Sequence, residues 1–229
     1  SWSYRNDSYS ASVNQLFKID DDRTLTFNIN YLYDRQKQDS HSITDYYLRN
    51  DSFWIINEIN RAVNHINFLG GNFVYKLNSR KLYLKDKSSL NFNFSRVNDA
   101  LEEDTGDVGQ RFNVNDFNFR NSFCLLTNRG IFGRSFTSEL SVYHTHTDLS
   151  LPEIHRNFLY NRFFIENGIN LLTFNFRLLK IVLDGKAGGR SSHITTDFLQ
   201  KNDVSYQEYN VLLNPTVMLF QQGKIQFTV

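Results

Sequence analysis

The sequence is poor in residues that cross-link or interrupt a chain, with one cysteine and two prolines among 229 residues. The single Cys124 cannot form an internal disulfide, which excludes a disulfide framework; in the apolar run 123–126 we expect it to be a small apolar filler. Proline cannot donate to a β-ladder, and aromatic side chains fit a pleated surface. The scarcity of proline beside 21 Phe and 12 Tyr therefore favours strands.

The chain also lacks a charge bias and a long apolar run. Its 25 basic and 24 acidic residues give a net charge of +1, so no nucleic-acid partner is indicated and no acidic disordered segment is predicted. Mean hydropathy is −0.47, and no apolar run is long enough for a transmembrane helix. Low hydropathy does not exclude a membrane protein, because a barrel strand alternates lipid-facing and lumen-facing side chains.

The two ends of the sequence have no feature of a separate domain. Residues 1–4 show neither the basic nor the apolar region of a signal peptide, and residues 224–229 stop within a strand pattern. We therefore expect residues 1–229 to be one barrel segment of a longer protein, without its plug domain or signal peptide.

Alternation of apolar and polar side chains is the main positive feature. Side chains on a strand point to opposite faces in turn, so the stretch 24–34 predicts a strand with one apolar and one polar face. The apolar face carries Leu25, Phe27, Ile29, Tyr31 and Tyr33. The polar face carries Thr24, Thr26, Asn28, Asn30 and Asp34.

Similar patterns predict about ten antiparallel strands, joined alternately by tight turns and long polar loops. The predicted strands include 9–19, 24–36, 54–77, 112–127, 163–178 and 209–219. We expect tight turns near Asp21, Arg129, Lys180 and Gly223, and long loops outside the cell at 37–51, 98–110, 148–157 and 196–205. A change of face at Gly70 and Gly71 predicts a β-bulge.

This organisation predicts an all-β fold, an antiparallel up-and-down transmembrane β-barrel. The predicted strands exceed the five or six residues usual in globular proteins, and a Greek-key sandwich would mix its loop lengths. Aromatic residues near strand ends fit interfacial girdles. A soluble β-sandwich binding module is the alternative fold.

The segment 73–84, the polar-aromatic hairpins and the stretch 213–216 resemble the barrel of TonB-dependent outer-membrane receptors, in the "outer membrane protein beta-barrel" branch. The resemblance implies a barrel of about 22 strands around a plug, of which this segment is roughly half. It implies import of a nutrient and four partners: membrane lipid, the plug of the same protein, the TonB complex and a surface lipoprotein. A passive porin and a structural or assembly barrel stay open, as do siderophore, glycan, peptide and cobalamin as ligands.

Two groups of candidate site residues follow from this interpretation. Stacking surfaces for a ligand are expected on the long loops, at Tyr46, Tyr47 and Phe198. Charged side chains on the polar faces are expected to face the lumen or the plug. These are Lys76, Asp116, Arg120, Glu139, Arg177, Asp184, Lys186, Arg190 and Glu208.

Other chemistry is not predicted. His144 and His146 share a strand face, but a strand end at the membrane interface explains them better than a metal site. The acidic residues at 102–107 lack the spacing of a calcium loop, and those at 20–22 are typical of a turn. No G-x-S-x-G motif is present, and residues 185–190 lack the Walker spacing and lie in a strand pattern. We expect no enzyme activity, cofactor or metal.

Overall fold

The computed structural model describes residues 2–47, 53–103, 106–129, 132–151, 154–176, 179–197, 202–219 and 223–226. The described residues form ten strands: β1 (Trp2–Lys18), β2 (Arg23–Tyr47), β3 (Phe53–Asn78), β4 (Leu82–Glu103), β5 (Gly106–Arg129), β6 (Phe132–Leu151), β7 (Ile154–Phe176), β8 (Leu179–Thr196), β9 (Asn202–Leu219) and β10 (Gly223–Gln226). No helix of the described chain is long and apolar enough to cross a membrane.

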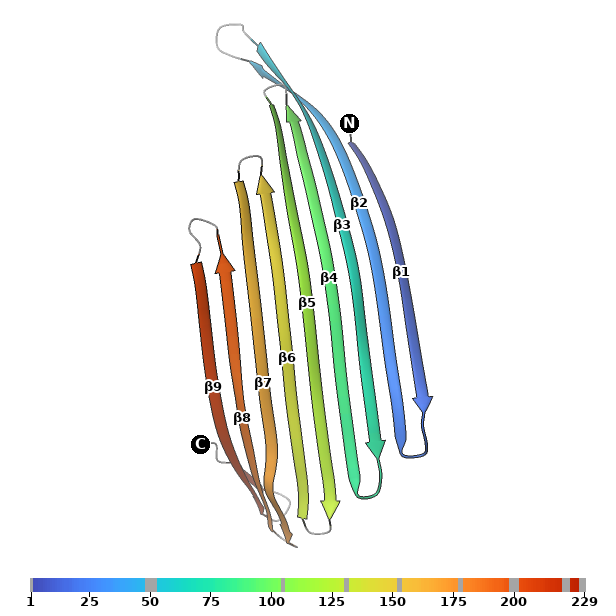
Figure 1. Cartoon of the computed structure of the whole chain (residues 1–229), viewed down its shortest axis with the longest axis vertical. Coiled ribbons are helices and arrows are strands. Elements are labelled where there is room, and N and C mark those ends of the chain that lie inside the picture. The colour runs from blue at the N-terminus through green and yellow to red at the C-terminus, as the bar shows by residue number, and fades with distance from the viewer. Residues whose placement is uncertain are drawn as a thin grey trace.

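All ten strands belong to one antiparallel sheet in which each strand pairs with its neighbours in sequence. Figure 1 shows them side by side in a single layer, running alternately up and down from blue β1 to red β9. The first and last strands of this order do not pair among the described residues, so the sheet is open. The predicted all-β, antiparallel up-and-down fold is confirmed, and an open sheet is what a barrel segment would form.

The predicted long loops are wrong. Strands β2 and β3 pair as far as Tyr47 and Phe53, and β4 and β5 pair as far as Glu103 and Gly106, so most of 37–51 and 98–110 is strand. In 148–157, residues 148–151 belong to β6 and 154–157 to β7. In 196–205, residue 196 ends β8 and 202–205 begin β9, while 198–201 lie outside the described residues. Polar composition does not distinguish a loop from a strand here, because the backbone groups form the ladder and polar side chains can pair across it.

The bulge predicted at Gly70 and Gly71 is also wrong. Both residues keep a continuous register, opposite Asn30 and Ile29. A Cβ on Gly70 would lie 2.7 Å from Cζ of Phe68 and 2.8 Å from Oδ1 of Asn91, so glycine there makes room for side chains. The register shift occurs instead in β7, between Asn170 and Leu172.

No hydrophobic side chain is buried among the described residues. Ile29 is 48% exposed, Leu69 45% and Phe73 44%, although all three lie in the middle of paired strands. A sheet normally buries its apolar face against a second layer. Within the described chain no such layer exists, so this apolar surface needs a cover from elsewhere.

Candidate functional site

The register divides the sheet into two continuous faces. Residues directly opposite one another on paired strands share a face, so each face can be followed from strand to strand. One runs from Phe17 through Leu25, Tyr75 and onward to Phe123, and we call it the apolar face. The other carries the intervening residues, and we call it the polar face.

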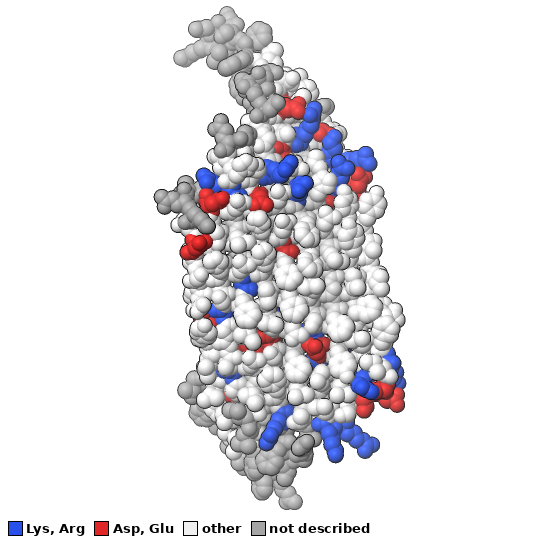
Figure 2. Space-filling model, in the orientation of Figure 1, with Lys and Arg blue, Asp and Glu red and all other residues white. Residues whose placement is uncertain are grey.

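The apolar face has a central belt with almost no charge. On β1 to β8 the belt consists of five successive rows, the first with Phe17 and Leu25 and the fifth with Tyr9 and Tyr33. The only Lys, Arg, Asp or Glu in these rows is Asp86, in the first row. On β2 the belt covers the nine residues from Leu25 to Tyr33, against about 9–11 residues for a tilted membrane strand. In Figure 2 the largest groups of charged side chains on the visible face lie toward the two ends of the strands, and smaller ones show between them.

A boundary band of polar residues ends this belt abruptly. The band consists of two neighbouring rows of the apolar face. The first row is Asp7, Arg35, His65, Arg96, Asn113, Asp148 and Asn157. The second row is Arg5, Lys37, Val63, Asn98, Arg111, Ser150 and His155. On β1, β2 and β4 the side chain therefore changes from aromatic to charged within one row, from Tyr9, Tyr33 and Phe94 to Asp7, Arg35 and Arg96.

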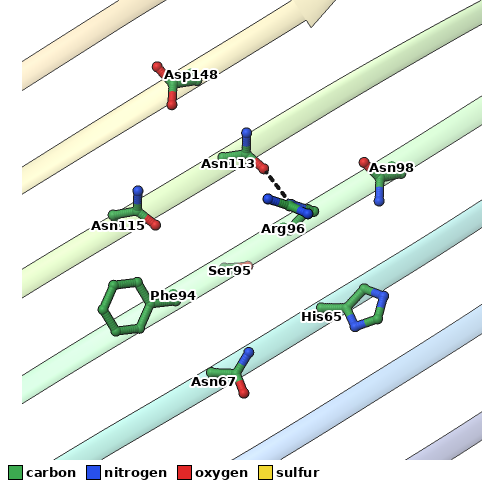
Figure 3. Close-up of a pocket in the computed structure, with 9 residues that line it drawn as sticks. All are labelled: His65, Asn67, Phe94, Ser95, Arg96, Asn98, Asn113, Asn115 and Asp148. Carbon is green, nitrogen blue, oxygen red and sulfur yellow. Dashed lines mark hydrogen bonds between the residues drawn. The ribbon is translucent and has the colours of Figure 1, made fainter.

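A hollow of about 540 Å³ crosses the edge of the belt. Figure 3 shows its lining residues on β3 to β6, with Phe94 on the belt side and His65, Arg96 and Asp148 in the boundary band. Arg96 Nε donates to Asn113 Oδ1 at 3.0 Å, and this hydrogen bond orients the guanidinium group of Arg96. The hollow therefore offers an aromatic surface beside an oriented cation.

The polar face holds the predicted lumen residues. The register places Lys76, Asp116, Arg120, Glu139, Asp184, Lys186, Arg190 and Glu208 on this one face. Arg177 lies outside the described residues. Arg120 Nη2 approaches Glu139 Oε2 at 3.5 Å, and Arg190 Nη1 approaches Glu208 Oε2 at 3.9 Å. A lumen-facing or plug-facing role for these groups stays a prediction.

Two partners on the polar face were missed by sequence reasoning. Lys186 Nζ lies 3.2 Å from Glu166 Oε1, and Asp184 accepts a hydrogen bond from Asn170 Nδ2 at 2.9 Å. Counting alternate residues along β7 would place Glu166 on the polar face. Its pairing with Lys186, however, requires the β7–β8 register.

The predicted aromatic ligand residues stay outside any described site. Tyr46 and Tyr47 lie at the end of β2, opposite Trp54 and Phe53, and not in a loop as predicted. Their side chains, like the whole of Phe198, lie outside what the structure describes. Their role in ligand binding stays a prediction.

The two histidines weighed as a metal site lie on the apolar face with other partners. His144 Nδ1 contacts Asn161 Oδ1 at 2.6 Å, and His146 Nε2 lies 3.1 Å from Asp148 Oδ1. No group of three His, Cys, Asp or Glu suited to a metal occurs in the described part of the chain.

Two further predictions about local structure are confirmed. The acidic residues at 20–22 form a turn, in which Asp20 Oδ1 accepts backbone hydrogen bonds from Asp22 at 3.0 Å and Arg23 at 2.8 Å. Residues 185–190 lie inside β8. A Cβ on Gly188 would lie 2.8 Å from the carbonyl oxygen of Ile165, so the small residue faces a crowded neighbour.

No protein-family model and no curated protein sequence matches the chain. Among solved structures it is similar to the crystal structure of BauA, the ferric preacinetobactin receptor from Acinetobacter baumannii, with 9% sequence identity and a TM-score of 0.37. The match covers 94% of this chain and 46% of that receptor, so the chain spans less than half of the receptor's length. At this TM-score the likeness carries no argument about function.

Proposed function

We propose that the chain is part of the wall of an outer-membrane β-barrel that imports a nutrient, as TonB-dependent receptors do. The observation that carries the proposal is the single-layer sheet, with an almost uncharged nine-residue belt on one face and charged, ion-paired side chains on the other. Lipid against the belt and water or a plug against the polar face would give both faces a suitable environment.

The missing cover argues for lipid over water. In water, exposed apolar side chains such as Ile29, Leu69 and Phe73 would lose about 25 cal/mol for each Å² that remains uncovered. In a bilayer the same side chains lie in an apolar solvent, and the antiparallel ladder satisfies the backbone groups between strands. Open sheet edges do not occur in lipid, so the proposal requires further strands of the full-length protein beside β1 and β10.

Plug, TonB complex and surface lipoprotein are the partners that a receptor of this kind would have, and they belong to the proposal. The segment itself is assigned no catalytic step. Ligand would be bound where the strands extend beyond the boundary band, away from the turn of Asp20.

A passive channel is the second candidate. The ion pairs Arg120–Glu139, Lys186–Glu166 and Arg190–Glu208 join neighbouring strands of the wall itself. All six side chains are partly exposed, the least being Glu166 at 28%. Charges that are paired within the wall and partly exposed fit a water-filled lumen, because they need no partner from a plug.

One experiment on the full-length protein tests both candidates. The protein is refolded into vesicles of neutral phosphatidylcholine, extracted with alkaline carbonate, and then placed in a planar bilayer in potassium chloride. Resistance to extraction with little conductance is expected for a plugged receptor. Free conductance would favour the passive channel, and release of the protein by carbonate would contradict the membrane assignment altogether.

A further inference from the structure

The boundary band contains more positive than negative charge. Its two rows hold the cations Arg5, Arg35, Lys37, Arg96 and Arg111 and the acids Asp7 and Asp148. Arg5 pairs with Asp7 at 3.2 Å, and Lys37 pairs with Asp39 at 3.0 Å.

Three arginines of the band form no ion pair with any described residue: Arg35, Arg96 and Arg111. Arg35 and Arg96 both lie opposite His65 on its two neighbouring strands, which places their backbones about 10 Å apart. Arg111 lies opposite Asn98, one row beyond Arg96. The three therefore lie in two neighbouring rows on β2, β4 and β5, with Arg96 between the other two and Asp7 opposite Arg35.

Two of these arginines are held in place by asparagines. Arg96 Nε donates to Asn113 Oδ1 at 3.0 Å, and Arg111 Nε donates to Asn98 Oδ1 at 3.1 Å. A guanidinium has five N–H groups, so one bond at Nε leaves both terminal nitrogens to bind an anion. Planar, oriented guanidinium groups suit the oxygens of phosphate.

We propose that Arg35, Arg96 and Arg111 bind the phosphate of an anionic membrane lipid, one whose headgroup has no cation to neutralise that phosphate, at the edge of the belt. Phe94, which is 50% exposed, lies on the apolar face one row before Arg96, and both line the same hollow. A ligand that meets both is therefore anionic at one end and apolar at the other. The site lies on the face away from the proposed lumen, so an imported solute does not reach it.

This inference rests on the proposed function, because the apolar face meets lipid only if the sheet is a barrel wall. A basic side chain near an anionic lipid contributes about fivefold in affinity, so three together should contribute well over tenfold.

The test uses the full-length protein folded in detergent and titrated with phosphatidylglycerol or phosphatidylcholine, with bound lipid counted by native mass spectrometry. The wild type should prefer phosphatidylglycerol. The triple variant Arg35→Gln, Arg96→Gln, Arg111→Gln should lose at least about tenfold in affinity for it. The matched control Lys85→Gln, Lys87→Gln, Arg162→Gln removes the same charge from the polar face and should keep the preference.

Equal binding of the two lipids would overturn the inference, and so would equal losses of affinity in the two triple variants. Displacement of the lipid by inorganic phosphate at a concentration as low as that of the lipid would also overturn it. If the triple variant does not fold, Arg96→Gln and Arg96→Lys replace it. Arg96→Gln should weaken binding more than Arg96→Lys, because the first removes the charge and the second only the oriented guanidinium. A protein that integrates into phosphatidylcholine vesicles without this preference refutes the lipid site alone. One that never integrates refutes the barrel proposal.

Discussion

Asn121 donates its side-chain amide to Asp86 Oδ1 at 2.6 Å and to Ser88 Oγ at 2.9 Å, where Asp86 lies in the first row of the belt and Asn121 in the second. Asp86 is the only Lys, Arg, Asp or Glu of the belt on β1 to β8, and Asn121 lies on the neighbouring strand, opposite Ser88. A carboxyl group that faces lipid is costly unless it is hydrogen-bonded. Asn121 therefore compensates for a polar group that the belt would otherwise leave unsatisfied.

The first prediction compares the loss of Asn121 alone with the loss of both Asn121 and Asp86. Asn121→Leu should lower the free energy of unfolding by about 1–3 kcal/mol, because Asp86 loses its donor in an apolar setting. Asp86→Leu with Asn121→Leu should recover most of that loss, since no polar group is then left alone. Urea titrations of the full-length protein in phosphatidylcholine vesicles measure both. If the double variant loses more free energy of unfolding than Asn121→Leu alone, water reaches Asp86 at this point of the belt.

The second prediction concerns which face meets lipid. Phe27 lies on the apolar face, opposite Phe73, with its ring centroid 5.8 Å from that of Phe17. Phe27→Arg should cost about 2–4 kcal/mol of folding free energy in the same titration, because the charge enters the lipid near the middle of the belt. Asn28→Arg, one residue along on the polar face, should cost much less. Similar costs at the two positions are incompatible with a one-sided belt.

The faces of the sheet could be predicted from the sequence, because they depend only on alternation along each strand. Leu25 and Phe27 share a face by this rule, and so do Asp116 and Arg120, whatever the register. The strand ends could not be predicted, because polar stretches such as 37–47 gain their strand conformation from pairing with β3. Glu166 and Lys186 were not recognised as partners for the same reason. The need for glycine at position 70 could not be predicted either, because the side chains of Phe68 and Asn91 occupy the space for a Cβ only once the strands are paired.

The third prediction uses two strand glycines in opposite surroundings. A Cβ on Gly188 would lie 2.8 Å from the Ile165 carbonyl oxygen, whereas one on Gly109 would have no atom within 4 Å. Gly188→Ala should therefore destabilise the folded protein by about 1–3 kcal/mol through overpacking. Gly109→Ala should be neutral or stabilise by about 0.4–1 kcal/mol, because alanine restricts the unfolded chain. A Gly188→Ala variant as stable as the wild type would contradict the close β7–β8 packing.

The fourth prediction concerns acid and the β1–β2 turn. A hydrogen bond from the Arg23 side chain holds the pKa of Asp20 below its ordinary value of 3.8, and the amides of Asp22 and Arg23 add to the effect. Because the pKa is lower in the folded turn than the ordinary value of 3.8, the stabilisation is complete at pH values well above 3.8 and is lost as the pH falls through the folded pKa. Amide exchange by NMR should show protection at Asp22 and Arg23 falling only in this acid range. In Asp20→Asn the protection should be weaker and independent of pH there.

The last prediction distinguishes a structural from a functional role for the charges of the polar face. Arg120 and Glu139 lie 3.5 Å apart and are 62% and 43% exposed, so their pair should contribute no more than about 1 kcal/mol to stability. Arg120→Gln should therefore leave unfolding nearly unchanged. If the polar face lines the lumen, however, it removes a positive charge from the pathway of ions and should shift the conductance of the full-length protein toward cations. Glu139→Gln is the matched variant of opposite sign and should shift selectivity toward anions.

An unplugged form of the protein shows these shifts most clearly in asymmetric potassium chloride, where the reversal potential reports selectivity. Identical reversal potentials for both variants and the wild type would place Arg120 and Glu139 away from the ion pathway, and the polar face would then need another role.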